Sequence, residues 1–164
     1  MSRVALLLLA LLIAAPAFAQ EPVGCDKFKW PLDKERAMLA AAIPVAAGGE
    51  IADPFAAAFR LPLAPTDAAG LPMPPTRAPR AGSNAGYVKA ASPGKAGTYR
   101  ITLSEGSWID VFQDGHEMKS AAFSGATGCE GVRKSVKFEL RAMPFIIELS
   151  GTTANMVAVA ITPD

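Results

Sequence analysis

A cluster of acidic residues is the first feature of this 164-residue chain whose types and spacing could do chemistry. Asp110, Asp114 and Glu117 surround an Asp-Gly dipeptide that is typical of a tight hairpin turn. Oxygen ligands close to such a turn suit calcium. The turn itself favours Asp114 for conformational reasons, however, and strand alternation places Asp110 on the same face as Trp108. We therefore predict no metal site here and keep these four residues as candidate ligand contacts.

The second candidate is the basic run Arg133-Lys134 with Lys137. Arg133 and Lys137 fall on one face of an alternating segment, together with Ser135, Glu139 and Arg141. Such a mixed stripe is typical of a sheet face in water, and the alternative is a site for an anionic ligand, so Arg133 and Lys137 join the candidates. Trp108 likewise has two interpretations, a platform on which a sugar stacks or a buried core residue.

A single histidine, His116, limits the catalytic chemistry of the chain. It excludes any site that needs two imidazoles from one chain. No G-x-S-x-G motif provides a nucleophilic serine, and no G-x-x-x-x-G-K-[ST] motif provides a phosphate loop. We predict no catalytic residues and no cofactor.

Cys25 and Cys129 are the only cysteines. In a secreted chain an oxidised pair is the default, and closing so long a loop stabilises by about 4–5 kcal/mol in the chain-entropy model. The alternative, a metal–thiolate site with His116 as third ligand, lacks the paired C-x-x-C spacing of zinc sites. We predict one disulfide, Cys25–Cys129, and no bound metal.

The secretory context comes from residues 1–19. A basic Arg3, a short apolar core and a terminal Ala-Phe-Ala match a Sec-type signal peptide cleaved after Ala19. The apolar core is shorter than the roughly 20 residues that a spanning helix needs. Cys25 does not follow a lipobox. We expect a periplasmic or secreted protein with no integral membrane segment once the leader is removed.

The elements that must position these residues change character along the chain. Good helix formers over 33–42 predict one short helix, which Pro44 limits. Six prolines between 62 and 79 predict an extended loop, interpreted as lying along the surface rather than as a proline-rich ligand for a partner. We expect residues 20–86, with their N-terminal segment, short helix and proline-rich segment, to pack on a core formed by 87–164, in one domain overall.

From residue 87 onward the hydrophobic period is two, and turn signals recur at roughly ten-residue spacing. This pattern predicts a mainly β protein, an antiparallel β-sandwich of jelly-roll or similar type. Val136, Phe138 and Leu140 are expected to face its core. One predicted strand runs from His116 to Ser124. The last, Met156 to Thr162, is apolar on both sides, which indicates a central strand or one covered on both faces.

The overall charge bears on which classes of partner the chain can be expected to bind. Sixteen Lys and Arg residues against fifteen Asp and Glu give a formal net charge of +1. This balance gives no electrostatic reason to expect a nucleic-acid partner. An apolar content of 51% argues against a wholly disordered chain.

Several segments resemble a family of small secreted alphaproteobacterial proteins of unassigned function. The likeness lies in residues 97–104, 108–111, 122–125 and 132–138, together with both cysteines and Trp30-Pro31-Leu32. Residues 85–162 are also similar in pattern to the pre-peptidase C-terminal type of β-sandwich. The family resemblance carries with it the label homogentisate 1,2-dioxygenase. An iron site of that kind needs two histidines, so the residues do not support the label.

These observations favour a noncatalytic binding module for an unknown ligand or envelope partner. A structural role in envelope assembly is the alternative. An enzyme, a dioxygenase or hydrolase, is a second alternative that the single histidine disfavours.

Overall fold

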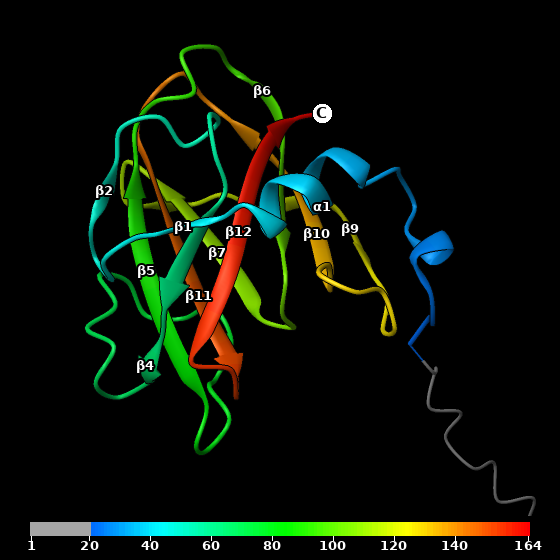
Figure 1. Cartoon of the computed structure of the whole chain (residues 1–164). Helices are drawn as coiled ribbons and strands as arrows, with labels where there is room; N and C mark the ends of the chain where they lie inside the picture. Colours follow the sequence, from blue (N-terminus) through cyan, green and yellow to red (C-terminus); the bar gives the residue numbers. More distant parts are fainter. Residues whose placement is uncertain (1–20) are drawn as a thin grey trace, which may run out of the picture.

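A computed structural model describes residues 21–164 (Figure 1). The predicted leader, residues 1–19, and its cleavage site lie outside the described residues. Two sheets pack face to face, with one short α-helix, so the predicted β-sandwich with a single N-terminal helix is confirmed. Among residues 21–164, no helix is long and apolar enough to cross a membrane.

The first sheet contains six strands. Their spatial order is β1 (Ile43–Pro44), β3 (Phe59–Pro62), β12 (Met156–Pro163), β6 (Gly97–Leu103), β10 (Lys134–Leu140) and β9 (Ser120–Gly125). All neighbours run antiparallel except β1 and β3, a two-residue parallel pairing at the edge.

The second sheet also contains six strands. Their order is β2 (Glu50–Ile51), β5 (Asn84–Ala90), β11 (Phe145–Thr152), β7 (Trp108–Gln113) and β8 (His116–Glu117), with β4 (Ala64–Pro65) pairing to β5 off this path. Residues 43–65 thus supply strands to both sheets, so the sandwich includes residues outside the expected core range, 87–164.

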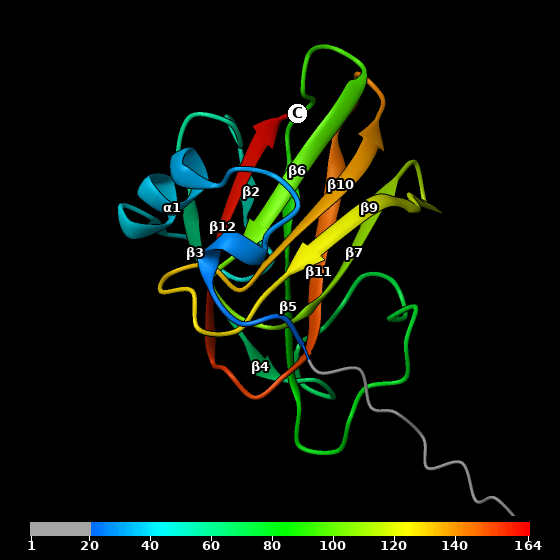
Figure 2. The same ribbon diagram turned by 90° about the vertical axis from the view of Figure 1, so that its right-hand side faces the viewer.

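The core between the sheets follows the alternation read from the sequence. Val136, Phe138 and Leu140 are buried in it, as expected. Phe59 and Leu61 of β3 join the same cluster, because β3 pairs with β12 inside the sheet. β12 is buried along nearly its whole length, as predicted, since α1 (Asp33–Ala40) packs against its outer side (Figure 2).

The Asp-Gly hairpin is present, but the strand that follows differs from the prediction. Asp114 and Gly115 have φ of 53° and 72°, the left-handed pair that a tight hairpin turn requires. The prediction of a single strand from His116 to Ser124 was wrong. This segment forms two strands: β8 pairs with β7 in the second sheet, and β9 pairs with β10 in the first. The chain crosses between the sheets at Met118 and Lys119.

Irregular segments cover the outer faces of both sheets. We call residues 21–42 the lead-in; they include a 3-10 turn, η1 (Cys25–Lys27), and α1, and they cover the first sheet. We call residues 66–83 the strap; they contain most of the prolines of the loop and contact the second sheet. The expectation that Ser135 faces water was wrong: it is 0% exposed, because Trp30 of the lead-in lies over it and donates from Nε1 to its Oγ at 3.1 Å.

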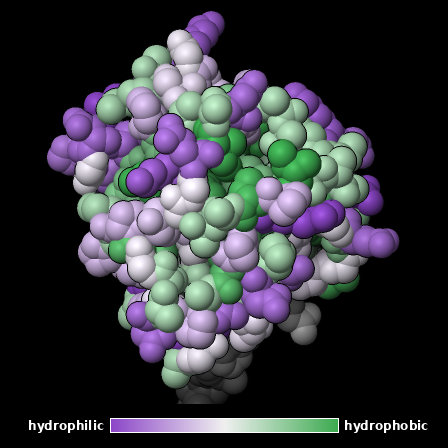
Figure 3. Space-filling view, turned by 60° about the vertical axis from the view of Figure 1, so that its left-hand side comes forward, coloured by the Kyte–Doolittle hydropathy of each residue, from purple (hydrophilic) through white to green (hydrophobic). Residues whose placement is uncertain are grey.

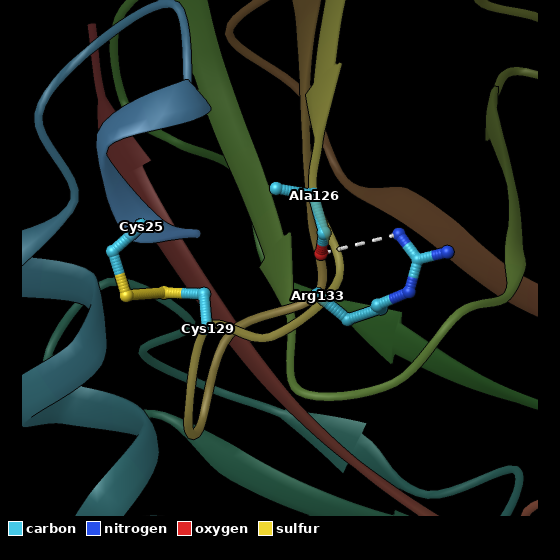
Figure 4. The surroundings of a disulfide bond; sticks show 4 residues. All are labelled: Cys25, Ala126, Cys129 and Arg133. Carbon is cyan, nitrogen blue, oxygen red and sulfur yellow. Dashed lines mark hydrogen bonds between the residues drawn. A yellow bond between two sulfur atoms is a disulfide. The ribbon is translucent and has the colours of Figure 1, made fainter. Parts of the chain in front are cut away.

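The predicted disulfide fastens the lead-in to the sandwich. Cys25 and Cys129 are bonded, with their Cα atoms 4.7 Å apart (Figure 4). Beneath it, Leu32, Leu39, Ala158 and Ala160 belong to a second apolar cluster, between the lead-in and β12. The lead-in is thus held by a covalent bond and a core of its own.

Candidate functional site

The six predicted ligand contacts separate into two groups. Trp108 and Asp110 lie on the outer side of β7, since Ile109 and Val111 between and beyond them face the core. Arg133 lies nearby, with its Cγ and Nε next to Gly106, two residues before Trp108. These three belong to one region of the molecule.

The other three candidates do not join them. Asp114 and Glu117 are exposed in the hairpin turn and on β8. Lys137 lies on the outer side of the first sheet, where its Nζ contacts the Asp164 carboxylate at 2.6 Å and lies 4.6 Å from the centre of the Trp30 ring. Within residues 21–164, no three His, Cys, Asp or Glu side chains are grouped to hold a metal ion.

Two cations contact the Trp108 ring. The guanidinium carbon of Arg77, on the strap, lies 3.5 Å from the ring centre, and the ammonium of Lys134, on β10, lies 4.4 Å from it. Lys134 also donates from Nζ to the Ser107 carbonyl at 2.8 Å. We call Arg77, Trp108, Arg133 and Lys134 the Trp108 cluster. In this cluster Arg77 of the strap and Lys134 of the first sheet contact the indole of the second sheet, and Arg133 precedes Lys134 in the chain.

A glycine makes room for the indole. Gly151 has φ of 71°, and a Cβ there would lie 2.8 Å from Cδ1 of Trp108. A side chain at position 151 would strain the backbone and force the indole to shift. Trp108 therefore rests against the end of β11 in a fixed position.

Positive charge is crowded around Lys134. Burial, followed by the charges of Arg77 and Arg133, lowers the pKa of Lys134 to about 8, against the opposing influence of Asp110 and Glu21. Both arginines therefore lie within electrostatic reach of Lys134. A negatively charged ligand at this position would relieve the repulsion between these cations.

The loop between β9 and β10 holds Arg133. Its Nη1 donates to the Ala126 carbonyl at 3.4 Å, across the loop that also carries Cys129 (Figure 4). Its Nη2 forms an ion pair with Glu21 at the start of the described chain. The disulfide that fastens the lead-in thus also restrains the loop that positions Arg133.

Two buried carboxylates bind the strap to the second sheet. Asp110 accepts hydrogen bonds from the hydroxyl of Thr76 at 2.6 Å and from its backbone N–H at 3.2 Å. Glu148, directly opposite Asp110 on β11, accepts the backbone N–H of Met73 at 2.9 Å. Because Arg77 follows Thr76 immediately, the same contacts place Arg77 on the indole.

Glu148 is the more perturbed of the two. It is 1% exposed, and its Oε2 is buried without a hydrogen-bond partner. Burial raises the pKa of Glu148 to about 7, with a further contribution from the Asp110 charge and an opposing one from the Met73 N–H. A proton on Oε2 would leave Oε1 free to accept from the strap.

A carboxylate pair of this kind could in principle perform acid–base chemistry. Here Asp110 is 7% exposed, and both carboxylates are occupied by strap donors. In this arrangement they accept hydrogen bonds from Met73 and Thr76 of the strap. Their observed role is to fix the strap.

Two recesses of the surface lie away from this cluster. One of about 310 Å³ is lined by both cysteines and the Trp30–Asp33 segment, and a second of about 690 Å³ lies along α1 beside Arg60, Glu105 and Met156. Neither contains Trp108, Asp110 or Glu148. On the face shown in Figure 3, strongly apolar side chains form small patches separated by polar ones.

Sequence reasoning missed two residues of this region, Arg77 and Glu148, and named Lys134 only as part of a basic run, without a contact to Trp108. Glu148 had a local signal, since a carboxylate in the run Phe-Ile-Ile-Glu-Leu-Ser interrupts an otherwise apolar strand. By alternation Lys134 is expected to point into the core, like Val136. It reaches Trp108 because it is the first residue of β10, at the edge of the sandwich. Arg77 had no signal, because its contact depends on where the strap lies.

Comparisons with protein-family models, curated proteins and solved structures found no match for this chain.

Proposed function

We propose that this chain is a noncatalytic binding protein that acts outside the cytoplasm and holds its ligand at the Trp108 cluster. One observation carries the proposal. Arg77 and Lys134 both contact one indole, yet in the described part of the chain neither forms an ion pair with a carboxylate. Cations gathered in this way, without a structural counter-ion, are a feature of ligand sites.

The proposed location rests on the leader pattern of residues 1–19 and on the disulfide. The proposed membership of a family of small secreted proteins agrees with both. N-terminal sequencing of the exported protein tests the location: we expect Gln20 as the first residue. A retained leader would contradict it.

The ligand-binding part of the proposal can be tested with the tryptophans themselves. The chain has two, so Trp30→Phe leaves Trp108 as the only tryptophan and as a fluorescent reporter of the site. We expect saturable changes in its emission with at least one member of a panel of soluble neutral and charged polysaccharides, without release of new reducing ends. Cleavage that Glu148→Gln abolishes would show an enzyme, and silence across the panel would contradict a binding function of this cluster.

A role in envelope assembly is the second candidate function, favoured by the edge of the first sheet. β9 pairs with β10 on one side only, and Phe123 within it is 58% exposed. An uncharged edge strand of this kind can add a strand from a partner. Light scattering of wild type and Ala121→Pro at high concentration tests this role, which predicts an assembly that the proline abolishes.

A further inference from the structure

We infer that the Trp108 cluster binds a compact, multiply charged oxyanion, a ligand that presents phosphate, carboxylate or sulfate groups to Arg77, Lys134 and Arg133. This inference names the ligand class for the proposed binding function and rests on it. Four observations support it: the shared indole, the uncompensated cations, the crowding of positive charge, and the way the cations cover the ring.

The geometry suits a small anion with at least two charged groups. Arg77 and Lys134 lie 3.5 Å and 4.4 Å from the same ring centre, so their charged groups are at most about 8 Å apart, a span that a ligand with two charged groups can bridge. Arg77 offers a planar fork of N–H donors that fits the two oxygens of a carboxylate or phosphate, whereas Lys134 acts as a point charge. The indole holds both cations in place before a ligand arrives.

A neutral sugar fits this platform less well. Stacking of a sugar needs an open aromatic face, and the guanidinium of Arg77 already lies 3.5 Å from the ring centre. A neutral sugar would have to displace this contact, while an oxyanion adds to it. The interpretation of Trp108 as a platform for neutral sugars is therefore the weaker of the two.

Two carboxylates oppose an anion here, and each is engaged. Asp110 is occupied by Thr76, on the side of the strap. Glu21 is ion-paired with Arg133 and is itself exposed. The Glu21 carboxylate therefore competes with an external anion for Arg133, and a more highly charged oxyanion would displace it. Removing the Glu21 charge should tighten binding.

The test titrates the full mature chain, carrying Trp30→Phe, with inorganic pyrophosphate and with citrate, following Trp108 emission at low and high salt. Dextran sulfate and neutral dextran form a second pair, which separates a free oxyanion from one on a polymer. We expect binding of the charged probes, weakening as salt rises, and no response to neutral dextran.

Substitutions then assign the residues. Arg77→Ala and Lys134→Met should each weaken pyrophosphate binding about tenfold or more, as expected for charge-assisted hydrogen bonds. Arg80→Ala, on the same strap, and Lys119→Met, an exposed lysine, are the matched controls and should change nothing. Glu21→Gln should strengthen binding a few-fold, a gain that damage to the fold cannot imitate.

The outcomes separate the two proposals. Equal responses to neutral dextran and dextran sulfate, unaffected by Arg77→Ala, would overturn the oxyanion inference and leave the binding function intact. Failure of all four probes overturns the inference, and the binding function falls only if the wider panel of neutral and charged polysaccharides fails too. Pyrophosphate binding that Glu21→Gln weakens would also overturn the inference, because it reverses the expected sign.

Discussion

The lead-in and the strap perform the same task on opposite sides of the sandwich, and they do so by different chemistry. Each is an irregular segment that covers the outer face of one sheet. The lead-in is held by a disulfide, an apolar cluster and the buried Glu35. The strap has no covalent cross-link to the sheet. It is held by hydrogen bonds to Asp110 and Glu148 and by the contact of Arg77 with Trp108.

This difference separates a fixed cover from an adjustable one. Contacts that depend on charge and on individual hydrogen bonds contribute little each and respond to pH and to ligands, whereas a disulfide and an apolar cluster do not. The strap also carries Arg77, a member of the proposed binding site. We therefore expect perturbations of the lead-in to change the stability of the whole fold, and perturbations of the strap to act locally.

The largest effect is expected from the disulfide. Replacing both Cys25 and Cys129 with alanine should lower the free energy of unfolding by about 2–5 kcal/mol, because the disulfide no longer restricts the unfolded chain. For a chain of this size that corresponds to a melting temperature lower by roughly 5–15 °C. Calorimetry measures it, and limited proteolysis should show new cleavage in the lead-in while the strap remains as resistant as in wild type. Unchanged melting would contradict the comparison.

Glu35 is expected to give the next largest effect. It is 1% exposed, accepts the hydroxyl of Thr162 at 2.6 Å, and lies 3.3 Å from Nη1 of Arg100. Glu35→Ala removes the acceptor and leaves Arg100 without its buried partner, at a cost of about 2–4 kcal/mol in the free energy of unfolding. Urea denaturation measures this cost.

The neighbouring Asp33 provides the control for Glu35. Asp33→Ala changes an exposed carboxylate on the same helix and should alter stability by less than about 0.5 kcal/mol. Equal costs for the two substitutions would mean that α1 is sensitive to any loss of charge, and not that Glu35 fixes the lead-in.

Glu148 makes the strap sensitive to pH. Its pKa of about 7 in the folded protein lies above the ordinary 4.5, so the folded state binds the proton more tightly than the unfolded state. Its contribution to stability is therefore fully present below about pH 4.5 and is lost as pH rises through 7. Glu148→Gln keeps an acceptor for the Met73 N–H and cannot ionise.

Melting temperatures at pH 5 and pH 7.5 test this linkage. We expect the free energy of unfolding of Glu148→Gln, relative to that of wild type, to rise by about 1–2 kcal/mol from pH 5 to pH 7.5. This window stays below the pKa of about 8 of Lys134, whose effect on stability has the opposite sign. Glu105→Gln, at an exposed carboxylate, is the control. A constant difference between mutant and wild type would contradict the assignment.

The sequence predicted the features that depend on local pattern or on elimination. Alternation over Lys134–Leu140 gave the inward residues, the Asp-Gly pair gave the hairpin, and two cysteines allowed a single pairing. The coverings of the outer faces could not be predicted in this way. The strap donors bond to carboxylates 34 and 75 residues away, and Trp30 reaches Ser135 across 105. No periodicity encodes such contacts.

The same limit explains the candidate site. Trp108 and Asp110 could be found because they share one strand face, whereas Arg77 and Lys134 reach the indole from a loop and from the other sheet. Arg133 and Lys137, on the other hand, share an alternating face in the sequence and serve separate partners, Glu21 and Asp164. Shared strand register therefore shows which side chains lie on one face of a sheet, but not which segments cover that face or which partners each side chain contacts.

The smallest effect is expected from Thr76, where the strap can be loosened without touching a charge. Thr76→Val removes the 2.6 Å hydrogen bond from the hydroxyl to Asp110 and keeps the volume and the branched shape of the side chain. Asp110 retains the Thr76 backbone donor, so the global stability should fall by only about 1 kcal/mol. Hydrogen exchange within the strap should rise, while exchange in the lead-in and the core strands stays as in wild type. The exposed Thr153, whose side chain makes no hydrogen bond in the described structure, provides the control Thr153→Val. Faster exchange throughout the sandwich would show that the strap is part of the cooperative core, and the distinction between a fixed and an adjustable cover would then fail.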